Sequence, residues 1–87
     1  MLDETSLSTK LLELARAAAP ALAQAQGDPR CADLRESGLT SIAAVRLMLE
    51  IEAAFDLAIP DGELTPENFA TIVSIEKLIR RLEPAAA

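Results

Sequence analysis

The stretch Gly38-Leu39-Thr40-Ser41-Ile42 stands between a polar, charged segment and an almost wholly apolar run that continues to Phe55. Ser41 therefore lies where a loop is expected to turn into a helix. At such a junction a serine can cap the helix and can also be exposed to solvent. Whether Ser41 only caps the helix or also carries chemistry decides the function of this protein.

The segment 41–55 is predicted to be a helix, and its composition predicts where that helix lies. After Ser41 its only polar residues are Arg46, Glu50 and Glu52. A helix that is apolar on nearly every side is expected to be packed by neighbours on several faces, which would make this one the central helix. Arg46 and Glu50 are four residues apart, so they can pair on its polar stripe, which would be worth a few tenths of a kcal/mol at most.

A first helix is predicted before this junction. Its apolar stripe recurs at helical spacing and consists of Leu7, Leu11, Leu14 and Ala18. The helix should end near Pro20, because proline interrupts the helical hydrogen-bond ladder. Residues 26–29 indicate a break, and from there to Gly38 we expect a long loop that is anchored in the core by Leu34 and Leu39.

Two more helical segments are predicted towards the end of the chain. Residues 56–63 are expected to form a loop stiffened by Pro60. Thr65-Pro66-Glu67 combines an N-cap, a proline at the first helical position and an early acidic residue, which predicts a short helix through Phe69. Thr71 should cap the last helix, whose buried stripe is expected to be Ile72, Ile75, Leu78, Ile79 and Leu82.

The predicted fold class is all-α, a bundle of three main helices plus one short helix. Alanine and leucine favour helices, whereas glycine occurs only 3 times in the 87 residues and aromatic residues make up only 2%. This length is in the range of one small domain. We expect a single domain over residues 1–87, with frayed ends at about 1–5 and 84–87.

The net charge of −6 is concentrated around the Ser41 region. Residues 28–67 hold nine acidic side chains and three arginines, whereas acids and bases balance in the rest of the chain. Such a field repels nucleic acid and anionic membranes and attracts basic protein surfaces. We therefore expect protein partners and no nucleic-acid partner.

The distribution of apolar and cysteine residues predicts a cytoplasmic protein. No apolar run approaches the roughly 18 residues of a membrane span. Asp3 and Glu4 stand where a signal peptide would have basic residues. Cys31 is the single cysteine, so no intramolecular disulfide can form, which is typical of a reducing compartment.

The residue types that conventional catalysis requires are largely missing. The sequence has no histidine, which removes Ser-His and Cys-His pairs and the commonest metal ligand. A lone cysteine cannot form a structural zinc site. Asp56, Asp61 and Glu63 do not match the spacing of a calcium-binding loop. We therefore expect no catalytic centre and no metal site.

Several short patterns follow one another between Leu34 and Leu82. They are Leu34-Arg-Glu-Ser-Gly38-Leu-Thr-Ser41-Ile, then Val45, Leu47 and Leu49, then Glu52-Ala-Ala-Phe55, then Ile59-Pro60-Asp61, and then the capped last helix. In this order they resemble the acyl carrier protein and peptidyl carrier protein superfamily, including its free-standing carriers of specialised metabolism. The resemblance implies a carrier-protein-like bundle without catalytic activity of its own.

In that superfamily the serine matching Ser41 is the attachment point for 4′-phosphopantetheine, a flexible arm whose thiol holds acyl or aminoacyl groups as thioesters. The resemblance implies three kinds of partner: a phosphopantetheinyl transferase, an acyl- or aminoacyl-loading ligase, and downstream acyl-processing enzymes. The carrier itself is expected to be a monomer. The residues expected to face these partners are Thr40, Ile42, Arg46, Met48, Glu50, Asp61 and Glu63, although Met48 fits the core equally well.

The chain also departs from the family pattern at the predicted attachment site. Most carriers have an aspartate immediately before the modified serine, whereas this chain has Thr40. Fatty-acid carriers are rich in acidic residues along the following helix, whereas here much of that surface is alanine and Arg46. The second departure favours dedicated partners over the standard fatty-acid enzymes. The first keeps an alternative open, an unmodified helical interaction or adaptor module with a carrier-like fold.

Overall fold

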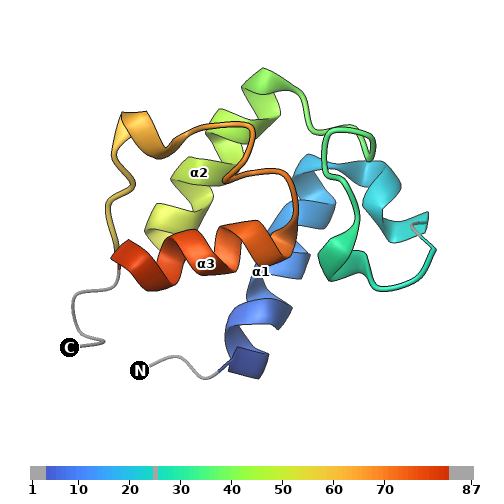
Figure 1. Cartoon of the computed structure of the whole chain (residues 1–87), viewed down its shortest axis with the longest axis horizontal. Helices are drawn as coiled ribbons and strands as arrows, with labels where there is room; N and C mark the ends of the chain where they lie inside the picture. Colours follow the sequence, from blue (N-terminus) through green and yellow to red (C-terminus); the bar gives the residue numbers. More distant parts are fainter. Residues whose placement is uncertain (1–3, 25, 83–87) are drawn as a thin grey trace.

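Three α-helices form the fold: α1 (Glu4–Ala18), α2 (Ser41–Phe55) and α3 (Ile72–Leu82). Figure 1 shows the computed structural model, which describes residues 4–24 and 26–82. No strand occurs in this part of the chain, so the all-α prediction is confirmed. Of the ends expected to fray, residues 1–3 and 84–87 lie outside the described residues, and residues 4 and 5 belong to α1.

Short 3₁₀ helices occur in the connections between the main helices. They are η1 (Pro20–Gln24), η2 (Pro29–Cys31) and η3 (Asp61–Glu63). The short helix expected to start at Thr65 is a single turn, in which the N–H of Phe69 donates to the Thr65 carbonyl at 3.1 Å. Thr65 caps this turn as predicted, since its hydroxyl accepts from the N–H of Asn68.

The predicted boundaries of α2 are confirmed, and local chemistry explains both of them. At the start, the Thr40 hydroxyl accepts a hydrogen bond from the N–H of Ala43 at 3.1 Å. At the end, Asp56 adopts a left-handed conformation with φ 54°, and its N–H donates to the carbonyl of Glu52. Aspartate tolerates this conformation better than most residues, so it can end the helix.

The prediction that α2 is the central helix is wrong. Only Leu47, Met48 and Ile51 are buried on it, whereas Ile42 and Leu49 are 78% and 54% exposed. The helix that packs against both of the others is α1, which contacts α2 and α3. The apolar composition of α2 therefore supplies one buried face and one exposed apolar face.

The expected stripe of α3 does pack into the core. Its isoleucines and leucines at positions 72, 75, 78 and 79 are buried, together with Leu7 and Leu11 of α1. Thr71 caps the helix as predicted, because its hydroxyl accepts from the N–H of Ser74 at 3.0 Å. None of the described helices has the length and apolar character that crossing a membrane requires.

The long loop before α2 is fastened on both sides. Leu34 and Leu39 are buried, as predicted. The N–H of Leu34 donates to the carbonyl of Ala70 at 2.8 Å, and the N–H of Ala21 donates to the carbonyl of Ser37 at 3.1 Å. These bonds connect the loop to the segment before α3 and to η1, so they fix where the chain enters α2.

The ion pair that the spacing of Arg46 and Glu50 allows is not formed in the described structure. Both residues are exposed, and the two ion pairs among residues 4–24 and 26–82 are Arg30–Glu76 and Arg81–Glu63. A solvated pair on a helix surface is worth only about 0.3–0.5 kcal/mol, too little to hold two long side chains together.

Candidate functional site

Ser41 is the first residue of α2, and its side chain is exposed. The residue that caps the helix is Thr40, whose hydroxyl accepts from the N–H of Ala43, and not Ser41. Within the described part of the chain the Ser41 hydroxyl has no hydrogen-bond partner. Because Thr40 performs the structural role, the oxygen of Ser41 is free for chemistry.

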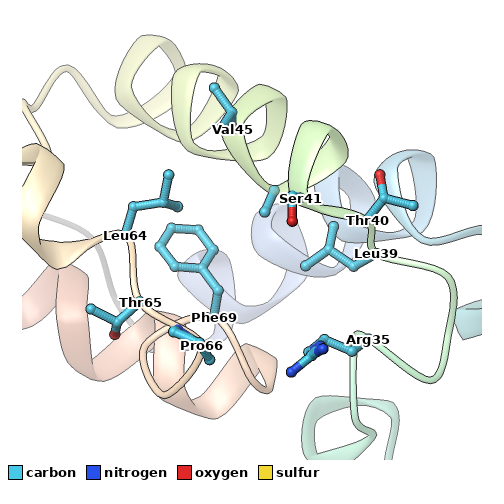
Figure 2. Close-up of a pocket in the computed structure, with 10 residues that line it drawn as sticks. Arg35, Leu39, Thr40, Ser41, Val45, Leu64, Thr65, Pro66 and Phe69 are labelled. Carbon is cyan, nitrogen blue, oxygen red and sulfur yellow. The ribbon is translucent and has the colours of Figure 1, made fainter.

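The Ser41 hydroxyl opens onto a pocket with a volume of about 310 Å³. In Figure 2 this hydroxyl points towards the pocket, whereas the hydroxyl of Thr40 points away from it. The pocket lies where the loop before α2, the first turns of α2 and the segment after η3 meet. It is lined by Arg35, Leu39, Thr40, Ser41, Ala44, Val45, Leu64, Thr65, Pro66 and Phe69.

The electrostatics of this pocket favour a negatively charged group near Ser41. The first N–H groups of an α-helix have no partner within the helix, and the helix dipole places a partial positive charge there. Arg35 adds a full positive charge at the pocket wall. No acidic side chain lines the pocket.

The arrangement can hold a group on the Ser41 oxygen. No general base lines the pocket, and no cluster of three potential metal ligands occurs among the described residues. A free primary hydroxyl, an open pocket and a positive environment together fit a phosphate ester on Ser41. An arm attached at this oxygen can also extend into solvent, because the Ser41 side chain is exposed.

Three of the residues expected to face partners lie on the exposed side of α2, namely Ile42, Arg46 and Glu50. Thr40 and Asp61 are also exposed. The prediction that Met48 faces partners is wrong, because Met48 is only 7% exposed and packs in the core. The leucine next to it, Leu49, is exposed instead.

Glu63 is also less available than expected. Its carboxylate accepts hydrogen bonds from Arg81 at 3.1 Å and from Asn68 at 3.0 Å, so it is engaged within the chain. Asp61 and Glu63 both lie in η3, but Glu63 is used to hold α3 and the turn after Thr65 in place.

Sequence reasoning missed Arg35, Val45 and Phe69 as residues of this site. Val45 lies one helical turn after Ser41, so helical spacing could have placed it beside the serine. Nothing in the sequence indicates that Phe69 reaches the same pocket, since 28 positions of the chain separate it from Ser41. Arg35 belongs to an irregular loop, where spacing predicts no direction for a side chain.

Residues 10–82 match the model of a protein family described as "Phosphopantetheine attachment site". Aminoacyl carrier protein 1 of Bradyrhizobium diazoefficiens is 47% identical over 57 residues, which cover 64% of this chain and 63% of that relative. The aminoacyl carrier protein of Agrobacterium fabrum is 49% identical over 49 residues, or 56% of this chain and 59% of that relative. The chain therefore matches less than two thirds of the length of these relatives.

Solved structures resemble the fold over most of its length. One is a crystal structure of an engineered Bradyrhizobium japonicum glycine:[carrier protein] ligase complexed with a carrier protein from Agrobacterium tumefaciens and AMP. Its matched chain has a TM-score of 0.67 and 34% identity, and the match covers 84% of this chain and 97% of that chain. A complex of the Bradyrhizobium japonicum ligase with a glycylated carrier protein matches with a TM-score of 0.63 and 36% identity over 83% and 97% of the two chains.

Proposed function

Since the chain belongs to the family of proteins with a phosphopantetheine attachment site, a group of carriers without catalytic activity of their own, we propose that Ser41 holds the arm and that its cargo is an aminoacyl group. The family match covers the pocket and all three of its walls. The relatives named as aminoacyl carrier proteins support the choice of cargo.

One observation carries the assignment to Ser41. Of the five serines, which all lie in the described part of the chain, it is the one whose hydroxyl has no partner. Ser8 donates to Glu76, Ser37 donates to a carbonyl, and Ser74 is bonded to Thr71. Ser6 also takes part in an interaction. Ser41, the serine with the unbonded hydroxyl, is also the one at the junction between the loop and α2.

Attachment converts the Ser41 hydroxyl into a phosphodiester. The serine oxygen forms a bond to the phosphorus of the phosphopantetheine group of coenzyme A, the bond from that phosphorus to the adenosine bisphosphate portion breaks, and the hydroxyl proton leaves to a base of the transferase. The attached arm supplies a thiol that forms a thioester with the cargo. The chain contributes the exposed oxygen and the positive environment that favours the new negative charge.

The exposed apolar face of α2 supports a loading ligase as partner. Ile42, Val45 and Leu49 are 78%, 41% and 54% exposed and recur on one side of the helix that begins at Ser41. An exposed apolar patch of this kind is typical of a protein interface. Arg46 and Glu50 lie beside it and can set the orientation of a partner, since charged side chains at an interface contribute specificity more than affinity.

We also propose that the carrier acts as a cytoplasmic monomer, so that one small protein can meet the transferase, the ligase and downstream enzymes in turn. Thr40 remains compatible with modification, because it caps the helix as the usual aspartate can and leaves the neighbouring hydroxyl free. The departure from the family pattern at position 40 therefore gives no structural support to an unmodified adaptor.

The test is incubation of the purified protein with coenzyme A and a promiscuous phosphopantetheinyl transferase, followed by intact-mass measurement. We expect one phosphopantetheine per chain in the wild type and in Ser74→Ala, and none in Ser41→Ala. Aminoacyl cargo is then tested with an aminoacyl:carrier ligase, an amino acid and ATP, for which a further mass gain sensitive to hydroxylamine is expected. No gain with several transferases, or a gain that survives in Ser41→Ala, would contradict the assignment.

A further inference from the structure

Arg35 is a cation without a partner at the pocket that the proposed attachment serine faces. It belongs to the turn that precedes Gly38, and its side chain is exposed. The backbone N–H of Arg35 donates to the Asp33 carboxylate at 2.9 Å. No group in residues 4–24 or 26–82 pairs with the guanidinium of Arg35. Figure 2 shows the guanidinium reaching towards the same pocket that the Ser41 hydroxyl faces.

Two other arginines show how this chain uses guanidinium groups structurally. Arg30 is bonded to Glu76, and Arg81 is bonded to Glu63. Both connect segments of the fold. Arg35 makes no such connection, and it is the one charged side chain among the residues that line the pocket. No ion pair among the described residues therefore connects Arg35 to another segment of the fold.

We propose that Arg35 binds the phosphodiester of the arm once Ser41 is modified, an inference that rests on the proposed function of Ser41. A phosphodiester on Ser41 would carry two unesterified oxygens close to the pocket that the Ser41 hydroxyl faces. Arginine suits such a group, because its planar guanidinium can donate two parallel hydrogen bonds to phosphate oxygens. The pocket would then hold the phosphate end of the arm.

The apolar part of the pocket fits the chemistry next to the phosphate. Leu39, Val45 and Phe69 line the pocket together with Arg35. The portion of phosphopantetheine that follows the phosphate carries a carbon with two methyl groups, which is the most apolar part of the arm. A cation for the phosphate and an apolar wall for the methyl groups would together hold the phosphate end of the arm at this pocket.

The expected effect is modest, because Arg35 is exposed. Exposed ion pairs are weak and are screened by salt. We expect hydrogen exchange at Nε of Arg35 to slow by roughly two- to fivefold when Ser41 is modified, and this protection to be lost at about 1 M salt. The apo protein should show no such protection at either salt concentration.

The experiment compares wild type, Arg35→Gln and the control Arg46→Gln, each converted to the modified form and checked by intact mass. Arg46 is a suitable control because it is also exposed and unpaired in the described structure, but does not line the pocket. The ³¹P resonance of the phosphodiester and the ¹⁵N–¹H resonance of Arg35 Nε are recorded at low and high salt. We expect the ³¹P resonance to shift in Arg35→Gln and to stay unchanged in Arg46→Gln, and the Arg35 Nε resonance to shift on modification of the wild type.

The outcomes separate this inference from the proposed function. Complete modification of Ser41 with no change at Arg35 Nε, or the same ³¹P resonance in wild type and Arg35→Gln, would overturn the role of Arg35 and leave Ser41 as the attachment site. Absence of a mass gain, or a gain that persists in Ser41→Ala, would overturn both.

Discussion

Arg30, in the loop before α2, donates hydrogen bonds from Nη2 and Nε to the carboxylate of Glu76 on α3, at 2.8 and 3.3 Å. Glu76 is only 5% exposed, and Ser8 of α1 donates to the same carboxylate. One buried carboxylate thus connects the loop to both α1 and α3. Because the loop leads into α2, this cluster helps to hold the segment that carries Arg35 and Ser41.

Glu76→Gln should destabilise the fold by about 1–2 kcal/mol, because a neutral amide bonds a guanidinium less strongly than a carboxylate does. The measurement is urea unfolding. Lys77→Gln is the matched control, since Lys77 is the exposed neighbour on the same helix and should change stability by less than about 0.5 kcal/mol. Equal stability of Glu76→Gln and the wild type would show that the cluster contributes nothing.

The cost of Glu76→Gln should be the same at pH 7 and pH 9. The hydrogen bond that Arg30 donates to Glu76, and secondly the negative charge of that carboxylate, raise the pKa of Arg30 above the usual arginine value. A raised pKa contributes stability that is fully present below the unfolded-state pKa and is lost only as pH rises through the folded-state pKa. Both values lie far above pH 9, so Arg30 stays charged across this range. A destabilisation by Glu76→Gln that is smaller at pH 9 than at pH 7 would contradict the conclusion that Arg30 stays charged in its pair with Glu76.

Thr40→Ala should destabilise the protein more than Ser41→Ala does. Thr40 accepts the capping hydrogen bond from Ala43, so its loss should cost about 1 kcal/mol, which corresponds to a decrease in Tm of about 4–8 °C for a domain of this size. Ser41→Ala removes an unbonded, exposed hydroxyl and should stay within about 0.5 kcal/mol. Thermal unfolding followed by circular dichroism measures the stability of both variants. A larger loss of stability in Ser41→Ala than in Thr40→Ala would show that Ser41 caps the helix.

Met48→Ala and Leu49→Ala form a matched pair that tests which residue belongs to the core. Met48 is 7% exposed, so its truncation should cost about 2–4 kcal/mol in urea unfolding. Leu49 is 54% exposed, so its truncation should change stability by less than about 0.5 kcal/mol. Similar costs for the two variants would contradict the orientation of α2.

Ile42→Asp combined with Leu49→Asp should impair loading by an aminoacyl:carrier ligase while leaving the fold intact. Both side chains lie on the exposed apolar face of α2, and central interface residues often contribute more than 1 kcal/mol each to binding. We expect a decrease of about tenfold or more in kcat/KM for the carrier. Thr9→Asp, an exposed change on α1, is the control. Unchanged loading of the double variant would place the ligase on another surface.

The helices of this protein could be located from its sequence because their signals are local. Residues 41–55 form α2 as predicted, and the stripe of α3 and the caps at Thr65 and Thr71 are where side-chain spacing and hydroxyl chemistry place them. Local signals also identified Ser41 as a serine at a helix start. Periodicity and capping depend on neighbours in the chain, so they need no knowledge of the fold.

Which face of α2 is buried was decided only by the tertiary structure. The composition of α2 is apolar nearly all round, so its sequence could not distinguish Met48 in the core from Leu49 in solvent; packing of α1 against α2 and α3 made that choice. The pocket at Ser41 is likewise a product of long-range packing, because Arg35, Val45 and Phe69 come from three separate segments. The sequence by itself determined the helices and the serine, and the tertiary structure determined what surrounds that serine, since contacts between distant segments leave no periodic trace in the chain.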